Sequence, residues 1–308
     1  MPKCCVITCM LFLGLSLTWT AAVASPANHP AESPSPCPVN GFDKATSLIQ
    51  AARAIACDVD RRQLLIVGDY HGSNEIPGFV AQLMADAAAS RPVRLGLEME
   101  SFEQKPIQVY MASKGTAADR AALLHDDFWT VGDGRTSQAI VRLIERAREL
   151  REEGRDVEVF TTVPEYPGDA AIKEAGGVNA YRSKGMAQII RSEVQHGAAH
   201  SLVIAFMGST HSAYVNLARG SESTVTERLL LDSPYVVNLD LRGGSVWGCA
   251  SDGCGPRALV DEATPTAKGS VLRKAHDKSG QPAQVWVRFP PLTSSPPAKE
   301  KKSNSRPG

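Results

Sequence analysis

The sequence predicts an α/β fold built on a buried, mostly parallel sheet. Three observations lead to this fold class. Short and almost continuously apolar runs recur along the chain, amphipathic segments of helical period alternate with them, and most runs end at glycine, proline or charged residues. Strands that are buried on both faces, as in parallel sheets covered by helices, have this near-continuous apolar character.

Six apolar runs are expected to form the strands. In chain order they are Leu64–Gly68, Val93–Met99, Val157–Val163, Leu202–Gly208, Tyr235–Leu241 and Val285–Phe289. Each is too short for a typical helix and suits a strand that is buried on both faces. The order of the strands within the sheet does not follow from the sequence.

The segments between these runs are expected to be helical, because apolar residues recur in them at helical spacing, as at Ile76, Phe79, Val80 and Leu83. The expected helices are Thr46–Cys57, Ile76–Ala89, Glu103–Ala112, Ala117–His125, Ser137–Glu153, Asn179–His196, Ala213–Arg219 and Thr224–Leu230. The chain is long enough for one large α/β domain or for one domain with an inserted lobe.

Both ends of the chain are expected to lie outside the core. Lys3, a short apolar stretch and the small residues Ala22 and Ala24 are typical of a cleaved secretory signal; an uncleaved anchor is the alternative. The expected organisation is a signal peptide over 1–24, a flexible arm over 25–41, an α/β domain over 42–289 and a disordered tail over 290–308. We therefore expect an exported protein, periplasmic or secreted, with no integral membrane segment after signal cleavage.

The cysteines support export. After signal cleavage four remain, an even number that favours disulfides in an oxidising compartment. Cys249 and Cys254 bracket a four-residue loop and are expected to pair, which leaves Cys37 to pair with Cys57. A zinc site is the alternative, although no paired CxxC modules are present. The 33 basic and 33 acidic residues balance, so no net charge recruits nucleic acid.

Two turns of the same form, GDYH at 68–71 and GSTH at 208–211, place a histidine at the end of an apolar run. A third run ends in Glu98 and Glu100. The carboxyl ends of parallel strands open onto one crevice, so His71, His211 and Glu98 are expected to share a pocket. Such a set suits either metal ligation or acid–base chemistry. Glu100 is also explained as a solvated residue that begins a loop.

Other polar residues near these turns have a functional and an ordinary explanation. Asp69 and Glu75 either orient the His71 ring or cap the following helix. Arg182 and Lys184 either stabilise negative charge on a substrate oxygen or are surface cations. Trp129 is expected to pack in the core, with pocket lining as the alternative. Three further histidines end or follow expected helices and are expected to face solvent: His125, His196 and His200. The sequence contains no GxSxG elbow, HExxH helix, P-loop, GxGxxG turn or CxxCH motif.

Four segments, GDYHGSNE, GLEME, RSKGMAQII and VIAFMGSTH, resemble the blocks of the ChaN-like, Tiki/TraB and erythromycin esterase superfamily. The resemblance spans roughly residues 60–220. It implies helices on both faces of the sheet and an inserted helical lobe near residues 103–150. It also implies His71, Glu98 and His211 as site residues, with Asp69 where the family usually has Glu. The branches are linked to haem and iron uptake, to metal-dependent proteolysis and to lactone opening by histidine-activated water.

Two functions follow as hypotheses. In the first, the chain is an exported hydrolase of a small-molecule or peptide substrate. His71 acts as general base on water, or holds a divalent metal together with Glu98 and His211, and Arg182 or Lys184 stabilises the oxyanion. In the second, the protein binds haem or iron without catalysis, and the imidazoles ligate iron together with Tyr70. The cofactor is left open between a divalent metal and haem.

Overall fold

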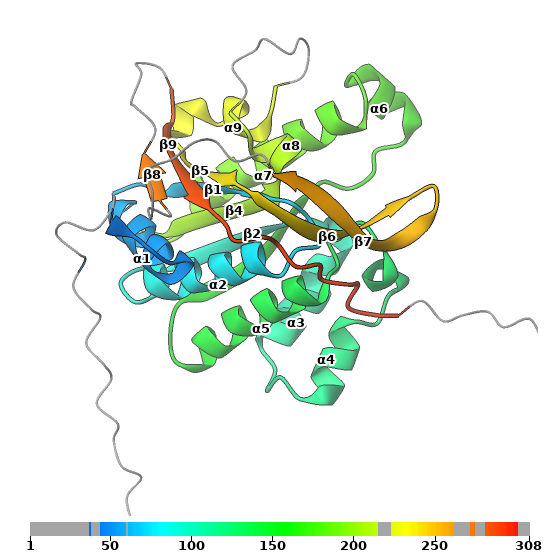
Figure 1. Ribbon diagram of the computed structural model, residues 1–308, viewed down its shortest axis with the longest axis horizontal. Coiled ribbons are helices and arrows are strands. Elements are labelled where there is room, and N and C mark those ends of the chain that lie inside the picture. The colour runs from blue at the N-terminus through cyan, green and yellow to red at the C-terminus, as the bar shows by residue number, and fades with distance from the viewer. Residues whose placement is uncertain are drawn as a thin grey trace, which may run out of the picture. The chain divides into compact units, whose positions relative to one another are not determined.

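A computed structural model describes residues 37, 44–59, 61–214, 223–261, 272–274 and 281–300. Its centre is a seven-stranded sheet in the order β3-β2-β4-β1-β5-β9-β8, in which β8 alone pairs antiparallel (Figure 1). The strands are β1 (Leu64–Asp69), β2 (Val93–Glu100), β3 (Val157–Val163), β4 (Leu202–Gly208), β5 (Tyr235–Asp240), β8 (Leu272–Lys274) and β9 (Ala283–Arg288). The predicted α/β class and mostly parallel sheet are confirmed.

Helices cover both faces of this sheet, and side chains that alternate along a strand pack against opposite layers. In β1, Leu65 and Val67 join the core under α1, α2, α3 and α5, whereas Leu64 and Ile66 join a second core under α7 and α9. Both faces of the sheet are therefore buried, which explains why the strands are continuous apolar runs. The α-helices are α1 (Leu48–Asp58), α2 (Glu75–Ala88), α3 (Gln104–Met111), α4 (Ala117–Leu123), α5 (Gln138–Glu152), α6 (Asp169–Glu174), α7 (Val178–His196), α8 (Ser209–Ser212) and α9 (Val225–Arg228).

The inserted lobe comprises the helices between β2 and β3. It contains α3, α4 and α5 together with the 3-10 turns η2 (Ser101–Glu103) and η3 (Asp127–Thr130); a further turn, η4 (Leu230–Asp232), precedes β5. Trp129 is fully buried in the lobe, and its indole N–H donates to Glu103 Oε2 at 3.1 Å. The packing role expected for Trp129 is confirmed, and this residue does not line the pocket.

A second, two-stranded sheet was not predicted. It is the antiparallel hairpin of β6 (Arg242–Ala250) and β7 (Gly253–Asp261), with Cys249 opposite Cys254. Its sequence is rich in glycine and polar residues, so neither the continuous nor the alternating apolar pattern of a strand is present. The expected disulfides Cys37–Cys57 and Cys249–Cys254 are both formed.

The segment Pro290–Glu300, here called the C-terminal strap, was expected to be disordered, and for these residues the expectation is wrong. Figure 1 shows the strap in red, passing the ends of α2 and α5. Backbone hydrogen bonds join Asn74 N to Thr293 O, Gln138 N to Pro296 O and Ala298 N to Thr136 O. Main-chain bonding of this kind fixes a segment whose composition predicts disorder.

Several expectations fall outside the described residues. These are the signal peptide over 1–24, nearly all of the flexible arm, the tail beyond Glu300 and most of the helix expected over Ala213–Arg219. Of the residues expected in that helix, Ala213 and Tyr214 are described and are not helical; the short α8 ends just before them, at Ser212. Within the described residues, no helix has the length and hydrophobicity needed to span a membrane.

Candidate functional site

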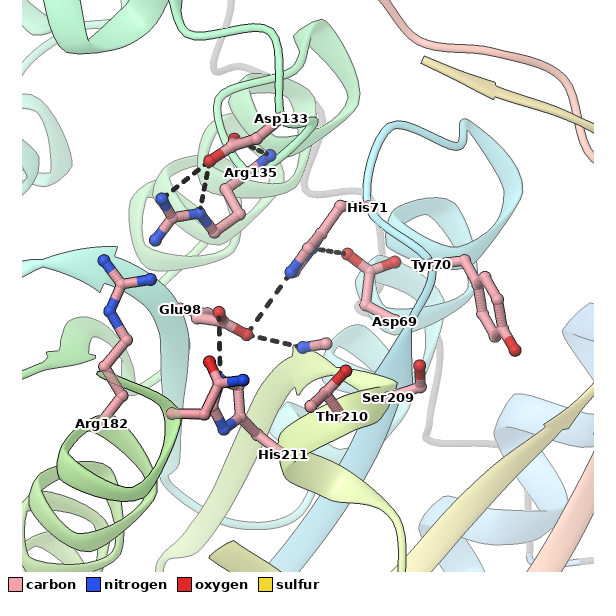
Figure 2. Close-up of a pocket in the computed structure, with 12 residues that line it drawn as sticks. Asp69, Tyr70, His71, Glu98, Asp133, Arg135, Arg182, Ser209, Thr210 and His211 are labelled. Atoms are coloured by element: carbon pink, nitrogen blue, oxygen red, sulfur yellow. Dashed lines mark hydrogen bonds and ion pairs between the residues drawn. The ribbon is translucent and has the colours of Figure 1, made fainter. Parts of the chain in front are cut away.

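A pocket of about 400 Å³ lies at the carboxyl ends of β1, β2 and β4, three adjacent strands of the sheet (Figure 2). The register aligns Asp69 of β1 with Gly208 of β4, so the turns that follow the two strands emerge together. The pocket is lined by Asp69, Tyr70, His71, Glu98, Asp133, Arg135, Asn179, Arg182, Gly208, Ser209, Thr210 and His211. His71, Glu98 and His211 therefore share one pocket although they are far apart in the sequence.

Glu98 lies at the centre of the group, and each of its oxygens faces one imidazole. Oε2 accepts a hydrogen bond from Gly208 N at 2.7 Å and lies 3.5 Å from His71 Nε2. Oε1 lies 3.8 Å from His211 Nε2, which is too long for a hydrogen bond. The pairing of β2 with β3 shifts between Leu97 and Glu100, so the strand is irregular where it delivers these carboxylates.

His71 lies between two carboxylates. Its Nδ1 is 2.7 Å from Asp69 Oδ2, and its Nε2 faces Glu98. Burial alone would lower the pKa of His71, but hydrogen bonds to Asp69 and Glu98 and the charges of both outweigh burial and raise its pKa to about 10. Burial would raise the pKa of Glu98, but the bond to His71 and the charge of His71 dominate and lower its pKa to about 2. His71 is therefore a cation and Glu98 an anion at neutral pH.

His211 has the opposite protonation state. Its Nδ1 lies 2.9 Å from Ser183 Oγ in a buried contact. Burial lowers the pKa of His211, Glu98 opposes this effect, and the positive charges of Arg182, His71 and Arg135 lower the pKa further. With Nδ1–H donated to the serine hydroxyl, Nε2 would carry the lone pair that faces the pocket. His211 is therefore neutral and available as a proton acceptor at neutral pH.

Two arginines line the pocket beside this cluster, and carboxylates hold both. Glu100 Oε1 accepts from Arg182 Nη2 at 3.0 Å and lies 3.4 Å from Arg135 Nη1. Asp133 Oδ2 accepts from Arg135 Nε at 2.9 Å and Nη2 at 2.7 Å. Glu100 is thus an anchor for guanidinium groups rather than a solvated loop residue.

Gly208 allows the two turns to approach each other. A Cβ on Gly208 would lie 2.8 Å from His71 Nε2 and 3.3 Å from Glu98 Oε2. Any side chain here would push His71 away from the carboxylate. The absence of a side chain at Gly208 in the second turn therefore makes room for the His71 ring of the first turn.

Three residues that were expected at the site do not take the expected roles. Lys184 is exposed on α7 and does not line the pocket. Glu75 accepts hydrogen bonds from the main chain and the hydroxyl of Thr293, so it fastens the C-terminal strap instead of orienting His71. Tyr70 lines the pocket, but Figure 2 shows its ring pointing away from Glu98. The histidines expected to face solvent are exposed: His125, His196 and His200.

Three contributors were missed in the sequence. Arg135 and Asp133 belong to a glycine-rich loop in the inserted lobe, and Ser183 lies beside Arg182 on α7. The pair of glycines around Asp133 was a usable signal, because glycines often mark a close backbone approach. Nothing in the local sequence connects Ser183 to His211, since the contact depends on how α7 packs against β4.

The metal-ligand hypothesis can be tested against the donor geometry. Within the described parts of the chain, no group of three or more His, Cys, Asp or Glu side chains has the spacing to hold a metal ion. Nδ1 and Nε2 of the His71 ring already face the carboxylates of Asp69 and Glu98. As arranged, His71, Glu98 and His211 do not fit a divalent ion, and we derive no metal-dependent step.

Comparisons with known proteins identify no family for this chain. No protein-family model matches the sequence, and no curated protein does. Solved structures with some similarity include RRSP, a MARTX toxin effector domain from Vibrio vulnificus, at 18% identity over 72% of this chain and 39% of that chain, with a TM-score of 0.39. A structure described as bacterial protein toxins gives 18% identity over 71% and 40%, with a TM-score of 0.42.

The type III effector HopBA1 is similar at 12% identity over 67% of this chain and 89% of that chain, with a TM-score of 0.41. This chain spans only 39% of the length of the first toxin structure it matches. At these identities and TM-scores, we infer no activity from the neighbours.

Proposed function

We propose that this chain is an exported hydrolase of the ChaN-like, Tiki/TraB and erythromycin esterase superfamily, in which His211 activates a water molecule. The observation that carries the proposal is the geometry of two histidines that face one buried carboxylate, an environment that raises the pKa of His71 and lowers that of His211. A neutral imidazole beside a cationic one supplies a base and a stabiliser of negative charge in the same pocket.

The superfamily assignment is supported by where the four resembling segments lie. Each of them supplies at least one residue of the pocket lining: His71, Glu98, Arg182 and His211. Short motifs that are scattered over a chain need not meet in space, so their meeting at one pocket favours a common origin over coincidence. Two disulfides in the described structure support the export part of the proposal.

In the proposed reaction, the lone pair on His211 Nε2 takes a proton from water as the water oxygen forms a bond to an ester or amide carbonyl carbon. The carbonyl oxygen becomes an oxyanion, which the His71 cation and Arg182 stabilise. When the intermediate collapses, the bond to the leaving group breaks and the leaving group takes the proton from His211. The products are a carboxylic acid and an alcohol or amine.

This proposal reassigns the base. Sequence reasoning gave that role to His71, but a group whose pKa is raised to about 10 holds its proton at neutral pH and cannot accept another. Haem binding by His71 is disfavoured by the geometry, because Nδ1 and Nε2 of its ring both face carboxylates. Lys184 has no role in the proposal because it lies outside the pocket lining.

The test is hydrolysis by protein that is exported and purified from the periplasm. The substrates are p-nitrophenyl acetate, dihydrocoumarin and a fluorogenic peptide. His211→Ala should lower turnover of any accepted substrate roughly 10²–10⁴-fold, the usual contribution of a general base. His196→Ala is the matched control, because His196 is exposed at the end of α7 and lies outside the pocket lining. Equal activity of the two variants would contradict the proposal.

A further inference from the structure

The loop that carries Arg135, residues 131–136, lies against the disulfide of the β6–β7 hairpin. A Cβ on Gly132 would lie 2.4 Å from Cys249 Sγ and 2.9 Å from Cys254 Sγ. The main chain of the loop therefore contacts the sulfur atoms with no room for a side chain. We call residues 131–136 the Arg135 loop.

The opposite side of the same loop lies against the turn that carries His71. A Cβ on Gly134 would lie 2.5 Å from the carbonyl carbon of His71 and 2.3 Å from Gly72 N. Gly134 also has φ +86°, in the left-handed region that favours glycine. The Arg135 loop is thus packed between the disulfide and the backbone of His71.

The hairpin and the C-terminal strap also hold the His71 turn directly. The carbonyl of Gly72 accepts from Trp247 N of β6 at 2.9 Å and from Ser295 N of the strap at 2.7 Å. A Cβ on Gly72 would lie 2.3 Å from Trp247 O. Main-chain contact therefore connects the hairpin to the residue that immediately follows His71.

From these contacts we infer that the Cys249–Cys254 disulfide is a positioning group for the pocket, which holds Arg135 and the His71 turn in place through the Arg135 loop. Both cysteines are solvent-exposed, so the disulfide is not part of a hydrophobic core. Its sulfur atoms instead form the surface on which Gly132 rests. The catalytic consequence rests on the proposed function, whereas the ordering of the loop does not.

The Arg135 loop has few bonds of its own. Arg135 N donates to Asp133 Oδ1 at 3.0 Å, and Thr136 Oγ1 donates to Val131 O at 2.8 Å. These two bonds shape the loop. Its attachments to other segments lie at its carboxyl-terminal end, where Arg135 pairs with Glu100 of β2 and Thr136 O accepts from Ala298 N, so residues 131–134 depend on packing against the disulfide and the His71 turn. Loss of the disulfide should therefore increase local opening of the loop more than global unfolding.

The experiment compares two variants of the full chain that each lose one disulfide. The test variant is Cys249→Ala with Cys254→Ala, and the matched control is Cys37→Ala with Cys57→Ala. Amide hydrogen exchange in residues 131–136 should become about tenfold faster in the test variant and stay unchanged in the control. The proposal is overturned if this segment exchanges equally in both variants, or if exchange accelerates uniformly over the whole chain of the test variant.

Gly132→Ala, measured with and without the disulfide, forms a double-mutant cycle. A disulfide that stabilised the whole protein without touching the loop would give additive effects on exchange. In the disulfide-bonded protein, the added methyl group meets both sulfur atoms and should accelerate exchange of the loop about tenfold. In the Cys249→Ala, Cys254→Ala background the sulfur atoms are absent, so the same substitution should add much less. Additive effects of Gly132→Ala in the two backgrounds would contradict direct contact between the loop and the disulfide.

If the wild-type protein hydrolyses p-nitrophenyl acetate, the test variant should also lose about tenfold in kcat/KM while the control keeps its activity. If the wild-type protein shows no hydrolysis, the proposed function fails and the exchange measurement still decides this inference. If hydrolysis is present and loop exchange is unchanged, the positioning role fails and the proposed function stands.

Discussion

The two Gly-x-x-His turns have the same spacing and follow adjacent strands, yet their histidines are in opposite charge states. His71 has a carboxylate at Nδ1, from Asp69, whereas His211 has a hydroxyl there, from Ser183. Both rings turn Nε2 toward Glu98. The partner at the far nitrogen thus decides which imidazole keeps its proton, and one repeated motif supplies two different chemical groups.

Among the changes to the groups around the two histidines, Glu98→Gln should have the largest effect, because it removes the carboxylate charge that both imidazoles face. The amide can still accept from Gly208 N, so the fold should persist. The pKa of His71 should fall, since one of the two carboxylates that raise it is gone. Hydrolysis should drop about 10²–10³-fold, the scale for losing one preorganised electrostatic contact. Glu158→Gln, which changes a surface carboxylate paired with Arg94, is the control and should keep full activity.

Asp69→Asn tests whether the carboxylate at Nδ1 keeps His71 protonated. Without the carboxylate at Nδ1, the pKa of His71 should move down toward its ordinary value, and the alkaline limit of activity should move down with it. At pH 8 the loss should be about tenfold or more, and it should shrink as the pH is lowered. A pH–rate profile that is unchanged on the alkaline side would show that Asp69 does not hold the proton on His71.

Ser183→Ala tests whether the hydroxyl at Nδ1 fixes the tautomer of His211. Removal of the hydroxyl leaves Nδ1 of His211 without its partner and frees the ring to change tautomer. We expect a loss of about tenfold in kcat with little change in KM, because Ser183 is not among the residues that line the pocket. Ser183→Thr keeps a hydroxyl and should restore activity; failure of this rescue would point to packing as the role of the serine.

The smallest expected effect is on stability as a function of pH. The pKa of His71 is raised from 6.5 to about 10, so its contribution is complete below pH 6.5 and is lost as the pH rises through about 10. The pKa of Glu98 is lowered from 4.5 to about 2, so its contribution is present above pH 4.5 and is lost as the pH falls through about 2. The free energy of unfolding, measured by denaturant unfolding across this pH range, should pass through a maximum. In Glu98→Gln, its decrease on the acid side should be smaller.

Much of this arrangement follows from local sequence. The continuous apolar runs predicted the parallel sheet, and strand ends predicted that His71, Glu98 and His211 would meet, since parallel strands open onto one edge. The cysteine spacing predicted both disulfides. These inferences succeed because each depends on a periodic or positional signal that one segment carries by itself.

The features that were missed depend on contacts between segments. The C-terminal strap and the β6–β7 hairpin are held largely by main-chain bonds, which leave no trace in composition. The charge of His71 depends on Glu98 from another strand, so the sequence supplied the residue but not its protonation state. Arg135 was not predicted as a site residue because it reaches the pocket from a loop of the inserted lobe and not from a strand end.

The most direct test is nitrogen NMR of protein labelled with ¹⁵N-histidine, with His71→Gln and His211→Gln used to assign the signals. At pH 8, the account predicts that His71 is doubly protonated and that His211 is neutral with its proton on Nδ1. In a pH titration, His71 should lose its proton only near pH 10, and His211 should gain one only below pH 6.5, the ordinary pKa of histidine. A neutral His71 at pH 8, or a His211 that binds its proton before His71 does, would contradict the account.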